Sequence, residues 1–258
     1  MRARMRYRDA MEDDFLDLVS HRPFPLPRSR WLWRQRWDSV LLLHFRVATA
    51  AIGPLVPPQL TLDEADGSAW VSVVPFRMCN VRPRCLPAIG PLSNFAELNV
   101  RTYVRAEGKP GVFFLKIQAR GALIAWFARM LSPLDYRAAA VDWQAAPSPQ
   151  TAALGPGAVS FRSPLVDVDF ASGHMLAPER RTPLDTFLTE RYCLYAATSA
   201  GVVRVDVHHL PWPLVEPRVR LLRNEALRSL AATNPMQPDL VHLSPGVEVA
   251  GWRSVPVP

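Results

Sequence analysis

The chain has few lysines and few cysteines, and it has no long hydrophobic run. Only Lys109 and Lys116 are lysines among 30 basic residues, and arginine cannot replace lysine as an amine nucleophile. The three cysteines are an odd number without CxxC spacing, which argues against a disulfide framework and a zinc site. The longest apolar runs, SVLLLHF and GALIAWFA, are far shorter than the roughly 20 residues that span a bilayer. The sequence therefore predicts reduced thiols, no bound metal and no contact with a membrane.

Several classes of function lack their signatures as well. The N-terminus MRARMRYRDAMEDDF has no apolar segment of the kind found in signal peptides, so we expect a cytoplasmic protein. The net charge is +7, but the arginines are scattered among acidic residues, so we predict no nucleic-acid partner. The motifs G-x-S-x-G, H-E-x-x-H and G-x-G-x-x-G and the P-loop are all absent, and we predict no cofactor.

Short segments of β-type alternation, separated by turns, occupy most of the 258 residues. The chain has 26 prolines and 12 glycines between these segments, a spacing typical of a β barrel or sandwich. Strands are predicted over 37–47 and 68–78, and a hairpin joins 95–104 to 111–119 through RAEGKP. Helices are predicted over 9–20, 121–131, 182–192 and 223–233. Residues 1–30 are expected to form an N-terminal helix and a Pro-rich arm, and residues 31–258 one β-barrel domain.

Polar residues alternate with apolar ones in ELNVRTYV, which predicts a strand with one polar face. Glu97, Asn99, Arg101 and Tyr103 share that face. Two interpretations remain open. The face is either exposed to water, as in many antiparallel sheets, or directed into a cavity, where these groups would bind a small polar ligand.

Adjacent histidines end the strand GVVRVDVHH, and strand alternation places them on opposite faces. His208 shares the polar face with Arg204 and Asp206, so we expect it to be exposed, whereas His209 points inward with the valines. The two side chains therefore cannot bind one metal from the same side. His209 is expected either to be a buried residue with one hydrogen bond or to contact a ligand.

Several longer strings, taken in their order along the chain, resemble the YqjF-like family of bacterial proteins of unknown function. These strings are RQRWDSVLLLHF, LVPPQLTLDEADGSAWVSVVPFRM, VRPRCLP, ELNVRTYV, GKPGVFF, ERYCLY and VHHLPWPL. That family in turn resembles the acetoacetate decarboxylase superfamily, which implies a closed, cone-like β barrel around an internal cavity.

The resemblance implies a cavity but not the decarboxylase chemistry. In that superfamily the first lysine of a Pro-Lys-Lys turn forms a Schiff base with a β-keto acid, and the second lysine lowers its pKa. The corresponding stretch here has Asp135, Tyr136 and Arg137 at those three positions, and Lys116 does not match the motif. Glu97 matches the glutamate of the decarboxylase, whereas its second acidic position falls near Ser72.

The sequence thus predicts a mostly β (α+β) fold, a closed, cone-like antiparallel β barrel with an internal cavity and a few peripheral helices. We expect it to bind a small anionic or keto-containing molecule. One alternative is a lyase or hydratase with Glu97 as general acid or base and no Schiff base. Another is a ligand-responsive protein whose arm holds a partner or a second subunit in a homo-oligomer. The candidate residues are Glu97 and Tyr136 for catalysis, and Asn99, Arg101, Tyr103, Arg137 and His209 for ligand binding.

Overall fold

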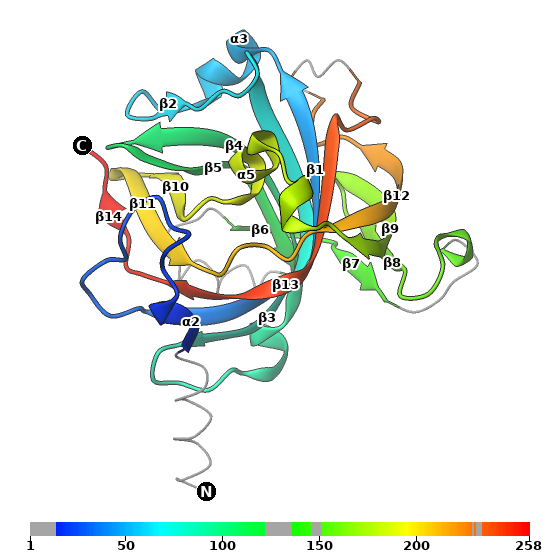
Figure 1. Ribbon diagram of the computed structural model, residues 1–258, viewed down its shortest axis with the longest axis horizontal. Coiled ribbons are helices and arrows are strands. Elements are labelled where there is room, and N and C mark those ends of the chain that lie inside the picture. The colour runs from blue at the N-terminus through cyan, green and yellow to red at the C-terminus, as the bar shows by residue number, and fades with distance from the viewer. Residues whose placement is uncertain (1–13, 122–135, 146–150, 229, 231–233) are drawn as a thin grey trace, which may run out of the picture.

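The computed structural model describes residues 14–121, 136–145, 151–228, 230 and 234–258, and strands make up most of them (Figure 1). Seven strands form a closed ring, because β11 pairs with both β10 and β13. In ring order they are β1 (Trp33–Val47), β3 (Ala69–Pro83), β4 (Phe95–Ala106), β5 (Lys109–Arg120), β10 (Cys193–Thr198), β11 (Gly201–His208) and β13 (Leu240–Gly251). The mostly β fold with few helices is confirmed.

The ring is not wholly antiparallel, which corrects the prediction in one respect. β10 runs parallel to β5, with Leu194 opposite Val112, while the other neighbours in the ring run antiparallel. Parallel neighbours need a long connection between them. The chain between Arg120 and Cys193 supplies it.

Four more strands continue the sheet beyond β13 and lie outside the ring. They are β12 (Val215–Asn224), β9 (Val166–Met175), β8 (Val159–Arg162) and β7 (Asp142–Gln144). Short strands pair with the ring at its edges: β2 (Thr61–Leu62) with β4, β6 (Tyr136–Ala139) with β5, and β14 (Val255–Pro256) with β11. The helices within the described residues are α2 (Asp14–Asp17), α3 (Thr49–Ile52) and α5 (Pro183–Thr189), with 3-10 turns at Gly53–Leu55, Gly90–Ser93, Ala152–Leu154 and Pro178–Arg180.

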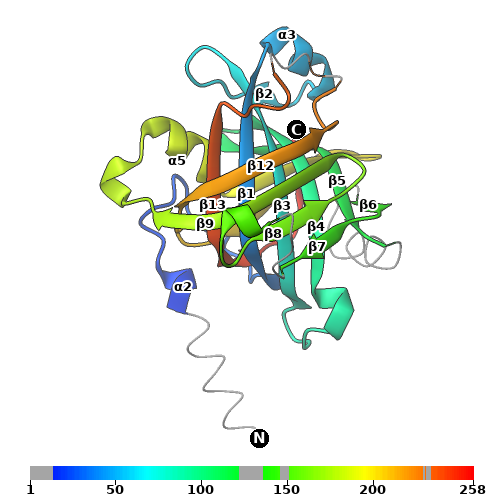
Figure 2. The same cartoon turned by 90° about the vertical axis from the view of Figure 1, so that its right-hand side faces the viewer.

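The apolar run in β1 is buried on both of its faces. Val40 and Leu42 point into the ring, whereas Leu41, Leu43 and Phe45 pack outward against the additional strands. Figure 2 shows β12, β9 and β8 lying across the outer face of the ring, on the side of these outward residues. Two-sided burial explains why this strand is apolar without alternation.

The hairpin predicted between residues 95 and 119 is confirmed as β4 and β5. Glu107 and Gly108 form its turn with φ values of 51° and 72°. Two successive residues with positive φ are characteristic of the tight turn that matches the twist of the flanking strands. The hairpin sets the register in which β4 presents its side chains to the interior.

One predicted helix is confirmed, and the others differ or lie outside the described residues. α5 begins as expected, with Thr182 as N-cap in a reciprocal capping box with Asp185. The helix over 121–131 lies outside the described residues, and only Asp14–Asp17 is helical within the described part of 9–20. The helix over 223–233 is wrong in its described part, because Arg223 and Asn224 extend β12 and pair with β9.

His208 is buried, which corrects the expectation that it is exposed. Residues 15–24 cover the outer face of β11, where the Nε2 of His208 donates to the carbonyl of Phe15 over 2.8 Å and Nδ1 accepts from Arg22 over 3.1 Å. The ring of His208 also stacks on Phe15 with a centroid distance of 5.4 Å. The strand alternation is as predicted, but the N-terminal arm shields the polar face from water.

His208→Ala should therefore destabilise the protein. We expect a loss of about 1 to 3 kcal/mol in the free energy of unfolding, because the carbonyl of Phe15 and the guanidinium of Arg22 each lose a hydrogen-bond partner. Urea denaturation measures this, and His174→Ala, at an exposed position, is the control. If the urea midpoints of both variants equal that of the wild type, the arm does not cover the outer face of β11 in solution.

Candidate functional site

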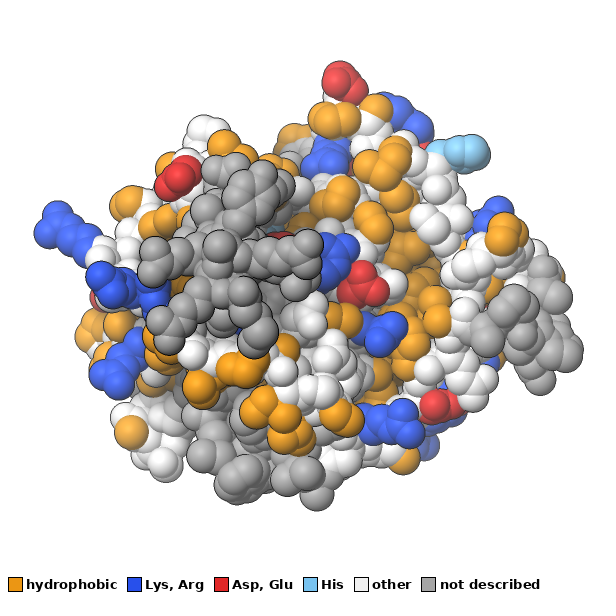
Figure 3. Space-filling model, turned by 90° about the horizontal axis from the view of Figure 1, so that it is seen from below, with side chains coloured by type: hydrophobic (Ala, Val, Ile, Leu, Met, Phe, Trp, Pro, Cys, Tyr) orange, Lys and Arg blue, Asp and Glu red, His pale blue; other side chains and the backbone are white. Residues whose placement is uncertain are grey.

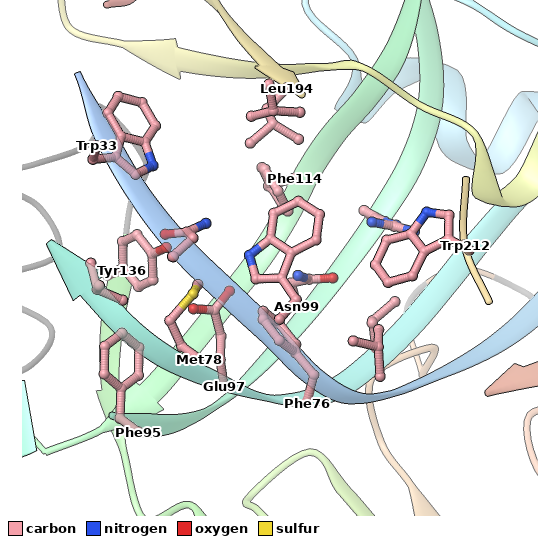
Figure 4. A pocket seen from close by; sticks show the side chains of 17 residues that line it. Trp33, Phe76, Met78, Phe95, Glu97, Asn99, Phe114, Tyr136, Leu194 and Trp212 are labelled. Carbon is pink, nitrogen blue, oxygen red and sulfur yellow. The ribbon is translucent and has the colours of Figure 1, made fainter. Parts of the chain in front are cut away.

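The ring encloses a cavity of about 60 Å³, which is room for a few water-sized groups. Its walls are mainly apolar and come from six of the seven ring strands, all except β13, together with Tyr136 and Trp212. Figure 4 shows their side chains converging on one space. The apolar lining consists of Trp33, Trp37, Val40, Val74, Phe76, Met78, Val81, Phe95, Phe114, Leu194, Val207 and Trp212. A small space with apolar walls and a few polar groups is typical of a site for a small molecule.

Strand β4 supplies three of the polar groups, Glu97, Asn99 and Arg101. They lie on the face that the sequence pattern predicted, while Leu98 and Val100 pack on the outer core. Glu97 and Arg101 are four residues apart, so their Cα atoms are separated by about 13 Å along the strand. The polar groups thus form a row along one wall.

Tyr103 shares this face but lies beyond the cavity lining. It is fully buried, and its hydroxyl contacts Ser72 over 2.5 Å and donates to the carbonyl of Leu188 over 2.9 Å. It also interacts with the guanidinium of Arg101. The structure thus places Tyr103 next to a lining residue rather than in the lining.

Burial raises the pKa of Glu97 from its usual 4.5 to about 8. Hydrogen bonds from Asn99 and Tyr136 oppose this shift without cancelling it, and only 2% of Glu97 is exposed. The carboxyl group is therefore protonated at neutral pH and has a proton that it can donate to a ligand.

Arg101 brings a positive charge to the cavity. The residue is 7% exposed, and within the described residues no carboxylate forms an ion pair with it. Burial lowers the pKa of its guanidinium, while Tyr103 partly restores it. The guanidinium of arginine nevertheless stays charged in proteins. A buried cation without a neighbouring anion is costly unless something else compensates it.

Four buried polar atoms of the lining residues have no hydrogen-bond partner. They are Nε1 of Trp37, Oε2 of Glu97, Oδ1 of Asn99 and Nε of Arg101. With Glu97 protonated, three of the four residues offer a donor. Buried polar atoms are normally paired, so this group of donors around a cationic side chain is suited to a ligand rich in acceptors.

Tyr136 and Arg137 lie on opposite faces of β6, so the expectation that both reach the cavity is wrong for Arg137. β6 pairs in parallel with β5, with Tyr136 opposite Ile117 and Arg137 opposite Gln118. The side chain of Tyr136 points inward, like that of Ile117, and lines the cavity beside Glu97 (Figure 4), whereas Arg137 is exposed. Asp135 lies outside the described residues.

His209 lies behind the cavity wall rather than in it. Its ring stacks on Tyr192 at 4.8 Å and contacts Trp212 at 5.0 Å, and its Nδ1 donates to the carbonyl of Leu210. Trp212 in turn stacks on Trp37 at 5.8 Å, and both tryptophans line the cavity. His209 therefore supports the aromatic wall.

Gln35 and Trp37 also line the cavity, although the sequence did not predict them there. Ser39 has a φ of 51°, and the pairing of β1 with β3 shifts register between Asp38 and Leu43. Before this irregularity the odd-numbered side chains, such as that of Trp37, point inward, and after it the even-numbered ones do, beginning with Val40. The alternation in RQRWDSV could have suggested a strand face with Gln35 and Trp37, but its direction depends on the irregularity.

Three further observations concern metal ligands, membrane-spanning helices and surface charge. Within the part of the chain that the structure describes, no group of three His, Cys, Asp or Glu side chains could hold a metal ion. None of the described helices is long and apolar enough to span a membrane. On the face shown in Figure 3, Lys and Arg side chains lie at several separate places among hydrophobic and neutral ones.

Comparisons with known proteins agree with the sequence-based resemblances. A family model, DUF2071, described as "Uncharacterized conserved protein", matches residues 34–248. The chain is 33% identical over 240 residues to "Uncharacterized protein YqjF" of Bacillus subtilis (strain 168), which covers 88% of this chain and 93% of the relative. The predicted resemblance to YqjF-like proteins is confirmed.

Solved structures with a similar fold include two from the decarboxylase group. An acetoacetate decarboxylase-like enzyme from Sphingomonas wittichii RW1 has a TM-score of 0.57 at 16% identity, over 92% of this chain and 98% of that one. Acetoacetate decarboxylase from Legionella pneumophila has a TM-score of 0.56 at 10% identity, over 94% and 93%. The enduracididine biosynthesis enzyme MppR, with HEPES bound, has a TM-score of 0.58 at 12% identity, over 88% of each chain. At these identities the likeness shows the fold alone.

Proposed function

The chain belongs to the DUF2071 family of uncharacterized conserved proteins, and we propose that it binds a small anionic molecule in the cavity of its ring. Arg101 is the anchor for the negative charge. Glu97, in its protonated form, and Trp37 donate hydrogen bonds to further acceptor atoms of the ligand. Asn99 and Tyr136 hold Glu97 in place.

A single observation carries this proposal, namely the buried cation of Arg101 that lines the cavity with its Nε unpaired. In a folded protein such a charge is strongly unfavourable by itself. A ligand carboxylate would form the charge-assisted hydrogen bonds that arginine favours. The protonated Glu97 leaves the cavity with a net positive charge, which favours a monoanion over a neutral molecule.

Schiff-base chemistry is not part of the proposal. The two lysines of the sequence are Lys109 and Lys116, and neither lines the cavity. Lys116 is exposed on β5, and the Nζ of Lys109 lies 3.8 Å from Oδ1 of Asp206. A lining without lysine supports binding of the ligand without a covalent amine intermediate.

The test compares the binding of pyruvate with that of pyruvamide, its neutral analogue. Pyruvate is a suitable probe, because the enzyme MppR, which has a similar fold, has a solved structure in complex with pyruvate. Wild-type protein should bind pyruvate more tightly, and Arg101→Gln should weaken pyruvate binding by about tenfold or more, because a charge-assisted pair is lost. Isothermal titration calorimetry measures both ligands.

Arg137→Gln is the matched control, because Arg137 is exposed on the opposite face of β6. It should bind pyruvate like the wild type. Equal affinities of the wild-type protein for pyruvate and pyruvamide would refute the anion site.

A second candidate function is a lyase or hydratase with Glu97 as its general acid. The observation that favours it is the pKa of Glu97 near 8 together with the buried Tyr136 hydroxyl beside it. A carboxyl group that is protonated at neutral pH can donate a proton to a developing carbanion or leaving group. In deuterated water the ionised form of Glu97 would remove a proton from C3 of pyruvate, and the carboxyl group, once deuterated by the solvent, would return a deuteron. NMR should therefore show a protein-dependent exchange at C3 that becomes faster as the pH approaches 8 and is absent in Glu97→Gln.

The interaction-protein alternative has less support. The described part of the N-terminal arm packs on β11 of its own chain, where Arg22 donates to the carbonyl of Val207 over 2.8 Å. An arm used in this way stabilises the fold that surrounds the cavity.

A further inference from the structure

A continuous chain of buried hydrogen bonds connects helix α5 to the cavity side of β4. It starts at the carboxylate of Asp185 at the N-terminus of α5, crosses two histidines and a serine, and ends at a tyrosine beside Arg101. None of its members lines the cavity. We call this chain the relay, and it consists of Asp185, His242, His44, Ser72 and Tyr103.

The carboxylate determines the tautomers of both histidines. Asp185 is ionised: burial by itself raises its pKa, but hydrogen bonds from Thr182 and His242 lower it below its usual value. A carboxylate only accepts, so the Nε2 of His242 must donate to Oδ1 of Asp185 over 2.8 Å. Burial lowers the pKa of His242 and of His44, so both rings are neutral. The Nδ1 of His242 is then an acceptor, and His44 donates to it from Nε2 over 3.1 Å.

The tautomer of His44 determines the direction of the hydrogen bonds of Ser72 and Tyr103, at the end of the relay nearest Arg101. Because the Nε2 of His44 carries its proton, its Nδ1 accepts, and Ser72 lies 2.7 Å away as the donor. Ser72 therefore has no proton left for Tyr103. The hydroxyl of Tyr103 must donate to Ser72, to the carbonyl of Leu188 or, over 3.3 Å, to the Nδ1 of His44. Each choice leaves a lone pair of the Tyr103 oxygen for the guanidinium of Arg101.

We infer that the relay positions Arg101 for the anionic ligand by turning the proton of Ser72 toward His44, so that the oxygen of Tyr103 is left to accept from the guanidinium. This inference rests on the proposed function of the cavity. His242 and Asp185 touch no lining atom, yet they would determine how Arg101 is held. In a buried network of this kind each proton position depends on its neighbours, so removing one member changes the far end.

The cross-strand register explains why the relay reaches this particular residue. Ser72 lies opposite Arg101 in the pairing of β3 with β4, and His44 lies opposite Ser72 in the pairing of β1 with β3. His242 on β13 is opposite Leu42, one inward position along β1. Inward side chains of four adjacent strands therefore form a row from α5 to Arg101.

Two variants of His242 separate positioning from packing. His242→Leu removes both hydrogen bonds, whereas His242→Gln keeps a donor for Asp185 and an acceptor for His44. Thr186→Ala is the matched control, because this threonine is exposed on α5 and its hydroxyl donates to the carbonyl of Thr182 rather than to a member of the relay. Each variant is titrated with pyruvate and with pyruvamide as the full chain.

We expect His242→Leu to lower the preference for pyruvate over pyruvamide by about five- to tenfold, with His242→Gln and Thr186→Ala within about twofold of the wild type. An equal loss of affinity for both ligands in His242→Leu would show a merely structural role and overturn the inference, while leaving the anion site intact. Failure of the wild-type protein to prefer pyruvate would instead refute the proposed function.

A second measurement needs neither a ligand nor a variant. Nitrogen-15 NMR of the wild-type imidazoles at pH 7 should show both His44 and His242 protonated at Nε2 and unprotonated at Nδ1. A proton on Nδ1 of either ring would reverse the relay and overturn the inference.

Discussion

Glu97→Gln should become more stable than the wild-type protein as the pH rises, by about 4 kcal/mol at pH 9. The pKa of Glu97 is about 8 in the folded protein against a usual 4.5, so the folded state holds a proton that the unfolded chain releases. This stabilisation is complete below about pH 4.5 and is lost as the pH rises through 8. Glutamine keeps the buried shape without the ionisation.

Urea denaturation of both proteins at pH 5, 7 and 9 measures this difference. The free energies of unfolding should be similar at pH 5 and should diverge toward pH 9. Glu179→Gln, at an exposed position in the 3-10 turn Pro178–Arg180, should follow the wild-type curve. Parallel curves for Glu97→Gln and the wild type would mean that water reaches Glu97 and that the cavity does not hold a neutral carboxyl group.

Arg101→Met should raise the stability of the ligand-free protein, although it removes the proposed anchor for the anion. We expect a gain of about 1 to 4 kcal/mol, the range found when buried ion pairs are replaced by apolar side chains of similar volume, because an uncompensated buried charge costs no less to desolvate. The physical reason is that burial of this guanidinium is compensated by Tyr103 only in part. A residue that lowers stability and supports binding is typical of a functional site.

Thermal melts with and without pyruvate test this prediction. The melting temperature of Arg101→Met should lie above that of the wild type without ligand, and added pyruvate should raise only that of the wild type. Arg137→Met serves as the control for replacing an exposed arginine and should leave both values unchanged. A lower melting temperature for Arg101→Met would show that the charge is already compensated in the empty protein.

Much of the local structure could be predicted from the sequence, because strands and turns have short-range patterns. The period of two in ELNVRTYV grouped Glu97, Asn99 and Arg101 on one face, and the structure places all three along the cavity. The turn at Glu107 and Gly108 and the capped start of α5 were likewise readable from a few neighbouring residues. The side chains of β4 lie where they were expected because alternation depends only on the strand itself.

Contacts between distant segments were decided by the tertiary structure. The parallel register of β6 turned Arg137 outward, and the arm buried His208 although its strand face was predicted correctly. The relay joins residues from β1, β3, β4, β13 and α5 that no sequence pattern connects. A strand's alternation determines which side chains share a face, but strand register and the packing of remote segments determine what that face meets. For this protein the sequence alone determined the strands and the polar row, and only the closed ring made that row a buried cationic cavity.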